Sequence, residues 1–343
     1  MEFTVSDRLL ITGASGLVGA NLVRALLAQG RNVRALIHHD HRALDGLDVE
    51  TISADVRDQA SLERAMAGIE VVYHLAGSIS LEMDSGSEMM EINTIGTRLV
   101  VNACMKCGVQ RLIHFSTIDA LKKDSLGTPV DEEQPLIDAD LTDDELARIP
   151  PYDLSKARAE REVLAGIGRG LDAVIVRPTA MLGPYDFKPS LIGQALLQLA
   201  NGKIPALVKA GFDWVDVRDV VAGVMRAERD APAGSSYMLG GNWHTLREVA
   251  VMAAAFSQRS APRLTVPFWL ADLFAPVMLK LASFNNTHPI YTRVTLEALR
   301  GDRHVSSARA ERELGYTARR LSETVRDTLT WFQEQGYLRG GTP

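Results

Sequence analysis

Short apolar runs alternate with segments of helical periodicity along the first half of the chain. The apolar runs predict five strands, at residues 9–11, 33–37, 49–53, 71–75 and 111–115. The segments between them predict helices at residues 17–27, 62–67 and 89–107. This alternation predicts an α/β fold, with a doubly wound parallel sheet of the Rossmann type. Such sheets bind ligands at the carboxyl ends of their strands, where Leu75-Ala76-Gly77 and Phe115-Ser116-Thr117 lie.

The regular alternation stops after the fifth strand. Residues 121–150 predict a long acidic loop, and a loop of that length is usually functional or mobile. A helix follows over Tyr152–Leu164, then a strand over Ala173–Arg177 that ends at Pro178. We predict one domain over residues 1–178, to which a strand and helix at about 212–230 return. A smaller substrate lobe is formed mainly by residues 179–211 and 231–343.

The longest apolar stretch runs from Leu264 to Phe284. Pro267, Asp272, Pro276 and Lys280 interrupt it, whereas a membrane span needs about 20 largely uncharged residues. We therefore predict an amphipathic helix and no integral membrane segment. Packing within the lobe is the favoured role, and contact with an apolar substrate, a partner or a membrane surface stays open.

Charge and cysteine content narrow the class of protein. The formal net charge is −6 and no cluster of Lys and Arg occurs, which argues against a nucleic-acid partner. The first seven residues lack the basic start and apolar run of a signal peptide, so we expect a cytoplasmic protein. Two cysteines do not make a disulfide scaffold. These are Cys104 and Cys107, late in a predicted helix, where packing is favoured over redox or metal chemistry.

Two segments far apart in the sequence carry the candidate chemistry. Gly13, Gly16 and Gly19 follow a strand and open a helix, a context typical of a phosphate-binding turn. Tyr152 and Lys156 are four residues apart, so they share one helix face. Lowering a tyrosine pKa from about 10 to about 7 takes about 4 kcal/mol. One ammonium about 4 Å away, at an effective dielectric constant of about 20, supplies about that much. The two segments together predict a redox enzyme with a proton-transfer site.

The glycine spacing Gly-x-x-Gly-x-x-Gly resembles that of the extended short-chain dehydrogenases/reductases, the NAD-dependent epimerase/dehydratase superfamily. The resemblance covers nearly the whole chain. Further matching segments are Asp55-Val56, His74-Leu75-Ala76-Gly77, Asn93-Thr94-Ile95-Gly96-Thr97, Arg177-Pro178-Thr179, Gly183-Pro184 and Val215-Asp216-Val217-Arg218-Asp219-Val220. Glu313-Leu314-Gly315-Tyr316 and Trp331-Phe332 recur in dihydroflavonol reductase-like and 3β-hydroxysteroid dehydrogenase-like proteins, which the chain resembles most.

The resemblance implies a set of site residues. Tyr152 would exchange a proton with the substrate oxygen, Lys156 would bind the nicotinamide ribose, and Thr117, beside Ser116, would bind the substrate oxygen. The implied cofactor-binding residues are Gly13, Ser15, Gly16, Leu17, Val18, Gly19, His38, Asp55, Val56, Leu75, Ala76, Gly77, Asn93, Tyr152, Lys156 and Pro178. It also implies a homodimer formed by the helices at 89–107 and 152–166.

The end of the second strand bears on the choice of cofactor. NAD-specific enzymes usually carry an acid there, and this chain has Ile37 followed by His38. His39 and Arg42 could add positive charge near a 2′-phosphate, so NADP is preferred, while Asp40 keeps NAD open. The run from His38 to His41 does not predict a metal site, because adjacent residues of a turn rarely converge on one ion.

One position bears on the substrate. Nucleotide-sugar enzymes of the family usually have Arg-Asp-Phe where this chain has Phe212-Asp213-Trp214. Losing that Arg removes a charge-assisted contact to phosphate, which favours a largely apolar small molecule. We therefore predict an NAD(P)-dependent reductase or dehydrogenase. The alternatives are a nucleotide-sugar epimerase or dehydratase, for which Asp119 is the only extra acid nearby, and a non-enzymatic NADP sensor, against which the intact Thr117, Tyr152 and Lys156 argue.

Overall fold

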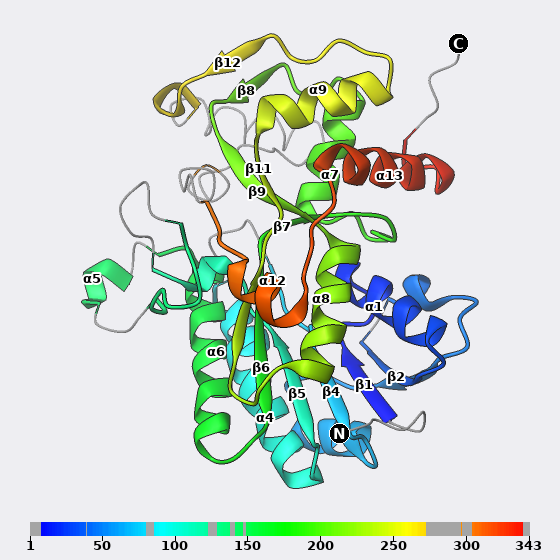
Figure 1. The fold of residues 1–343 in the computed structure, drawn as a ribbon, viewed down its shortest axis with the longest axis vertical. Helices are drawn as coiled ribbons and strands as arrows, with labels where there is room; N and C mark the ends of the chain where they lie inside the picture. Colours follow the sequence, from blue (N-terminus) through cyan, green and yellow to red (C-terminus); the bar gives the residue numbers. More distant parts are fainter. Residues whose placement is uncertain are drawn as a thin grey trace.

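The computed structural model describes residues 8–38, 40–79, 86–122, 129–137, 141–146, 149–271, 296 and 304–338. Its main layer is a seven-stranded sheet in the order β10-β6-β5-β4-β1-β2-β3, in which every neighbouring pair is parallel (Figure 1). The strands are β1 Arg8–Thr12, β2 Asn32–Ile37, β3 Glu50–Ser53, β4 Val71–His74, β5 Arg111–Phe115, β6 Ala173–Pro178 and β10 Ser236–Leu239. The predicted doubly wound parallel sheet is confirmed.

Helices cover both faces of this sheet and enclose one apolar core on each. α1, α8 and α12 pack on one face, and α2, α4 and α6 on the other (Figure 1). Their bounds are α1 Leu17–Ala28, α2 Gln59–Met66, α4 Gly96–Cys107, α6 Pro151–Gly168, α8 Val217–Asp230 and α12 Ala308–Leu314. Along β5, Leu112 enters one core and Ile113 the other, so a strand buried on both faces is apolar throughout.

The helix predicted over residues 89–107 is interrupted. It starts as α3 (Gly86–Met89), continues through a π-helical turn, η3 (Met90–Ile95), and only then becomes α4. Such π-turns occur frequently at functional sites because the added residue changes which side chains face a neighbour. Other short elements are η1 (Arg42–Leu44), η4 (Ile118–Ala120) and α5 (Asp143–Leu146).

A smaller lobe lies at the carboxyl end of β6, which leads directly into it (Figure 1). It contains a three-stranded sheet, β11-β9-β7, and a two-stranded sheet, β12-β8. The strands are β7 Ala180–Leu182, β8 Ala206–Val208, β9 Gly211–Asp216, β11 Asn242–Thr245 and β12 Leu264–Val266, and the helices are α7 Leu191–Ala200, α9 Leu246–Phe256 and α13 Leu321–Glu334. The three helices pack together over their own apolar core.

Two expectations for the second half need correction. The helix at 212–230 returns to the main sheet as α8, but the strand before it, β9, pairs with β7 and β11 in the lobe. Phe212 and Trp214 on β9 pack into the lobe core, which holds that strand there. β10, assigned to the lobe segment 231–343, instead completes the main sheet beside β6.

The apolar stretch Leu264–Phe284 begins as a strand, and its described residues 268–271 are helical. Leu264–Val266 form β12, which pairs in parallel with β8. Residues 272–284 lie outside the described residues. Within the described part of the chain, no helix is long and apolar enough to cross a membrane.

Candidate active site

The glycine segment forms a tight turn between β1 and α1. Gly13 has a φ of +70°, and Gly16 stands at the N-cap of α1 and donates its N–H to the Gly13 carbonyl at 3.1 Å. A Cβ on Gly13 would lie 2.7 Å from the Ala76 nitrogen, and one on Gly19 would lie 2.3 Å from the Gly13 carbonyl oxygen. Only glycine fits at these two positions. The turn therefore presents bare backbone and a helix N-terminus, the features that bind a pyrophosphate.

A chain of buried hydrogen bonds joins the ends of β1 and β4. Thr97 donates its hydroxyl to the Asn93 carbonyl at 2.6 Å, so at 3.0 Å it accepts from His74 Nε2. His74 Nδ1 is then the acceptor for the Thr12 hydroxyl at 2.8 Å, and Thr12 accepts the Ala76 N–H at 3.1 Å. Burial lowers the pKa of His74 to about 3, so the imidazole is neutral. These bonds fix the two strand ends that carry Gly13 and Ala76.

The π-helical turn ties the loop after β4 to helix α6. Asn93 accepts from the Ser78 N–H at 2.7 Å and donates to the Ser78 carbonyl and the Ser155 hydroxyl, both at 2.9 Å. Ser155 in turn donates to the Tyr152 carbonyl at 2.8 Å, and Thr94 donates to the Ser155 carbonyl at 3.0 Å. The Asn93 amide, expected to contact a cofactor, is engaged by protein groups on both sides. The sequence reasoning missed Ser78 and Ser155.

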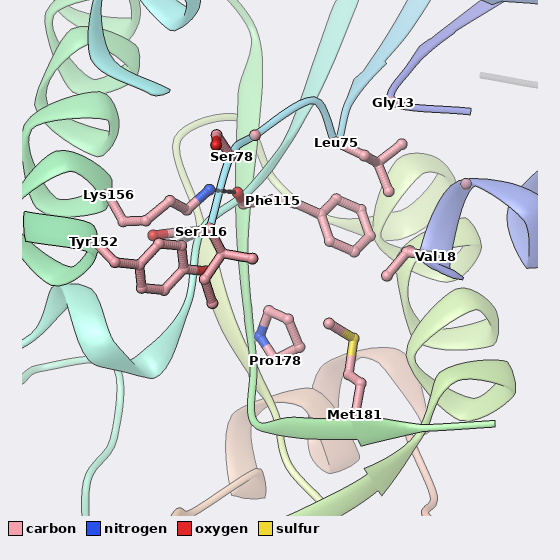
Figure 2. Close-up of a pocket in the computed structure, with 13 residues that line it drawn as sticks. Gly13, Val18, Leu75, Ser78, Phe115, Ser116, Tyr152, Lys156, Pro178 and Met181 are labelled. Atoms are coloured by element: carbon pink, nitrogen blue, oxygen red, sulfur yellow. Dashed lines mark hydrogen bonds between the residues drawn. The ribbon is translucent and has the colours of Figure 1, made fainter. Parts of the chain in front are cut away.

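A cavity of about 160 Å³ opens at the carboxyl ends of β4, β5 and β6 (Figure 2). Of the predicted site residues, Gly13, Val18, Gly19, Leu75, Gly77, Tyr152, Lys156 and Pro178 line it. Ser78, Ile79, Phe115, Ser116 and Met181 line it as well. Each of these follows or ends a strand of the main sheet or starts the lobe, and that position was the signal that could have identified them.

Tyr152 and Lys156 project from the first turns of α6 towards the strand ends (Figure 2). Lys156 donates through Nζ to the Phe115 carbonyl at 2.5 Å, and burial lowers its pKa to about 8. Burial also raises the pKa of Tyr152 above its ordinary value, and the Asp119 and Asp153 carboxylates raise it further, while a hydrogen bond with Thr117 lowers it. The sequence predicts a Tyr152 pKa that Lys156 lowers. In the structure, burial and the Asp119 and Asp153 carboxylates raise this pKa instead.

Thr117 and Ser116 have different surroundings at the end of β5. Thr117 caps η4, donates its hydroxyl to Asp119 Oδ2 and accepts from the Asp119 N–H, both at 3.2 Å. The Ser116 hydroxyl is buried at the cavity and has no hydrogen-bond partner among the described residues. Thr117 therefore binds Asp119 and does not line the cavity, whereas Ser116 lines it.

The residues at the adenosine end of the predicted cofactor site are partly paired with each other. His38 Nε2 lies 3.6 Å from Asp55 Oδ2, which Arg57 also binds, at 2.7 Å. Arg42 binds Asp40 at 2.6 Å and lowers the pKa of that carboxyl to about 2. The charge of Arg42 is thus already balanced. His39 lies outside the described residues.

The arrangement fits a nicotinamide nucleotide. The turn of Gly13, Gly16 and Gly19 has room for a pyrophosphate. The Ser116 hydroxyl offers a hydrogen-bond donor and acceptor inside the cavity, which Tyr152 and Lys156 also line. Among the described residues, no group of three His, Cys, Asp or Glu side chains could hold a metal ion.

Cys104 and Cys107 face α2. Cys104 lies 3.9 Å from the sulfur of Met66, and Cys107 lies 3.7 Å from the Glu63 carbonyl. Burial raises the pKa of both thiols. Their contacts are those of helix packing, the role favoured from the sequence.

Known proteins resemble this chain over nearly its whole length. The profile of the "NAD dependent epimerase/dehydratase family" matches residues 9–240. "Sterol demethylase protein B" of Methylococcus capsulatus is 34% identical over 338 residues, which cover 96% of this chain and 99% of that protein. A "Putative dihydroflavonol 4-reductase" of Synechocystis sp. is 30% identical, with 98% and 97% covered. The crystal structure of gox2253 superposes with a TM-score of 0.83 at 34% sequence identity. The superposition covers 97% of this chain and 100% of the gox2253 chain.

Proposed function

The chain belongs to the NAD dependent epimerase/dehydratase family and is an NAD(P)-dependent oxidoreductase of the extended short-chain type; we propose that it interconverts a carbonyl and a secondary alcohol on a largely apolar small molecule. The observation that carries this proposal is the half-buried Tyr152 and the buried Lys156 on one helix, both lining a cavity whose walls include Phe115, Pro178 and Met181. Sterol demethylase protein B and the putative dihydroflavonol 4-reductase, by their names, act on molecules of this kind.

Each residue then has one task in the reduction. A bound nicotinamide nucleotide supplies the hydride. Tyr152, held protonated by its surroundings, donates its proton to the carbonyl oxygen as negative charge develops there. Lys156 provides a positive charge beside the phenol, and Ser116 and Thr117 provide hydroxyls on the β5 side. The lobe, residues 179–211 with parts of 231–343, would enclose the substrate. Phe212 supports an apolar substrate, because it occupies the position where a nucleotide-sugar enzyme would have a phosphate-binding Arg. Its ring packs edge-on against that of Trp214, with the two ring centroids 5.4 Å apart.

The test is a spectrophotometric assay. Purified protein is mixed with NADPH and a panel of apolar ketones, and nicotinamide absorbance is followed. We expect net oxidation, and we expect Tyr152→Phe to lower kcat by about 10²- to 10⁴-fold with NADPH binding unchanged. Conversion of a nucleotide sugar without net redox change would instead indicate an epimerase. Full turnover by Tyr152→Phe would overturn the assignment.

NADP is the proposed cofactor. β2 ends at Ile37 without a carboxylate for a ribose 2′-hydroxyl, His38 follows, and the nearby Asp40 is bound by Arg42. We expect kcat/KM to be at least about tenfold higher with NADPH than with NADH. Equal values with the two nucleotides would contradict this preference.

A homodimer through α4 and α6 is also proposed. Ile95, Met105 and Leu164 are exposed on or next to these helices, which favours an apolar contact. Light scattering coupled to gel filtration measures the mass directly. The cytoplasmic location stays a prediction.

A further inference from the structure

The end of the lobe farthest from the main sheet carries two exposed apolar side chains. This end consists of β8, β12 and the loop that joins α9 to β12 (Figure 1). Leu264 on β12 is 60% exposed, and Trp269, three residues after β12, is 67% exposed. Val266 and Phe268, in contrast, pack against a small core of the lobe. The described start of the apolar stretch at 264–284 therefore presents a leucine and a tryptophan at the surface.

Four exposed cations lie at the same end of the lobe. Lys203 and Lys209 flank β8, and Arg259 and Arg263 precede β12. Within the part of the chain that the structure describes, none of the four takes part in an ion pair. Their charges are therefore available to a partner.

Parallel strand pairing gathers three of these cations before the strands. The first residues of β8 and β12 pair with each other, so the segments that precede them, with Lys203 and Arg263, lie at one end of the two-stranded sheet. The guanidinium of Arg259 lies there too, because its Nη1 would be 3.7 Å from a Cβ on Gly202. Leu264 is thus next to three positive charges.

The fourth cation and the tryptophan follow the strands. The Lys209 N–H donates to the Val266 carbonyl at 3.3 Å, and Trp269 comes three residues after that carbonyl. Strands of three residues span about 10 Å, so the groups at their two ends belong to one surface. We call this surface the lobe tip, and its residues are Lys203, Lys209, Arg259, Arg263, Leu264 and Trp269.

The charge of the lobe tip is opposite to that of the whole chain. The chain has 43 Asp and Glu against 37 Lys and Arg, whereas residues 191–212 and 249–271 contain four Lys and Arg and no Asp or Glu. Cations attract anionic headgroups, and tryptophan prefers the boundary between headgroups and acyl chains. A second copy of this chain would bring the same positive tip and be repelled by it. The lobe tip is therefore complementary to an anionic lipid surface.

We propose that the lobe tip docks on an anionic lipid bilayer, with Trp269 and Leu264 inserted at the headgroup boundary and the four cations against the phosphates. The proposal does not depend on the carbonyl–alcohol reaction. Because the tip is opposite the main sheet, docking places the lobe between the bilayer and the glycine turn (Figure 1). An apolar small molecule dissolved in the bilayer would meet the lobe first.

The experiment measures sedimentation of the full chain with two kinds of vesicle. One is pure phosphatidylcholine, and the other contains equal parts of phosphatidylcholine and phosphatidylglycerol. We expect at least about tenfold higher affinity for the anionic vesicles, falling as sodium chloride screens the charges. Arg259→Gln combined with Arg263→Gln should lower that affinity about 30-fold, since each cation near an anionic surface contributes about fivefold.

Arg8→Gln combined with Arg64→Gln is the matched control, because it removes two exposed cations from the main domain and should leave the affinity unchanged. Equal affinity for the two kinds of vesicle would overturn the proposal. An equal loss in the two double variants would also overturn it, because the charge of the whole chain would then account for the binding.

Trp269→Phe tests the insertion separately. It should keep vesicle binding within a few-fold but lose most of the quenching of tryptophan fluorescence by brominated lipids, because Trp214 and Trp331 are buried. Unchanged quenching would contradict insertion at the tip. A halved mass of Trp269→Ala in light scattering, without vesicle binding by the unaltered protein, would show that a second copy covers the tip. Vesicle binding by a protein that oxidises NADPH with no ketone would defeat only the proposed function.

Discussion

The strand ends of the main sheet at the site and the interior of the lobe are stabilised by different kinds of contact. In the main sheet, His74 uses both ring nitrogens in hydrogen bonds that link two strand ends and the α4 side. The lobe relies on aromatic packing around Trp331, whose ring centroid lies 5.0 Å from that of Phe187 and 5.4 Å from that of Phe332. Tyr185 and Tyr337 complete that aromatic group.

The two kinds of contact suit two different functions, catalysis in the main sheet and substrate binding in the lobe. Hydrogen bonds are directional and short, so they fix the positions that hydride and proton transfer require. Aromatic and aliphatic packing is less directional, and cores held by it tolerate exchange of one apolar residue for another. The chemistry is therefore expected to depend on the main sheet, and substrate choice on the lobe.

The largest expected effect comes from Gly19→Ala, which disturbs the main sheet at its most crowded point. The new Cβ would lie 2.3 Å from the Gly13 carbonyl and 2.6 Å from the Ala14 Cα, and backbone atoms cannot move aside. We expect a loss of about 3 kcal/mol in the free energy of unfolding and loss of NADPH binding. Thermal unfolding and nucleotide titration measure the two effects.

Gly16→Ala is the control for that experiment. Its Cβ would meet only the Gly13 carbonyl, at an ordinary 3.5 Å, and its φ of −77° suits any residue. Its melting temperature should match that of the unaltered protein. Any loss of nucleotide affinity in this variant would then come from weaker contacts to the phosphates and not from a less stable protein. Equal melting temperatures for Gly19→Ala and Gly16→Ala would contradict the close packing of this turn.

Sequence reasoning was most successful where one local pattern determines the structure. The strand–glycine–helix pattern identified the turn at Gly13, and the spacing of Tyr152 and Lys156 placed both on one helix face. The π-helical turn could not be predicted in this way. Its register depends on bonds from Asn93 and Thr94 to α6, which lies some 60 residues further along the chain.

The lobe could be predicted less well, because its sheet is built from strands distant in sequence. The apolar pattern of β9 is compatible with either sheet. Its pairing with β7 and β11 places it in the lobe sheet. Ser116 and Thr117 show the same difficulty at the site. Both carry a hydroxyl at the same strand end, and only the position of Asp119 distinguishes their surroundings.

An effect that is smaller for each side chain is expected from pH, and it concerns the main sheet alone. His74 and His114 are buried there, and burial lowers both pKa values below the ordinary value of about 6.5. The folded state disfavours their protonated forms. Stability is therefore fully present above pH 6.5 and falls as pH drops below it, by about 1.4 kcal/mol per pH unit for each histidine. Denaturant unfolding between pH 7.5 and 5 measures the slope.

The two histidines give that measurement its control. His114 has no partner for either ring nitrogen among the described residues, whereas both nitrogens of His74 are bonded. His114→Leu should remove half of the slope and leave stability at pH 7.5 equal or higher. His74→Leu should also remove half, but with a loss of about 1–3 kcal/mol at pH 7.5. Unchanged slopes would show that these side chains do not titrate with unfolding.

The smallest effect concerns Arg24, which joins the two regions. Its guanidinium lies 4.4 Å from the ring centroid of Tyr185, and it donates to the Ala43 carbonyl at 2.8 Å. Arg34 has similar bonds, to the Ala65 carbonyl at 2.8 Å and to Glu50 at 2.9 Å, but only within the main sheet and its helices.

Arg24→Ala and Arg34→Ala should each lower the free energy of unfolding by about 1 kcal/mol. Only Arg24→Ala should also raise the KM for the substrate, by several-fold, because it alone loosens the lobe against α1. Equal KM values in the two variants would mean that other contacts position the lobe, such as the bond from Asn21 on α1 to the Pro184 carbonyl at 2.9 Å.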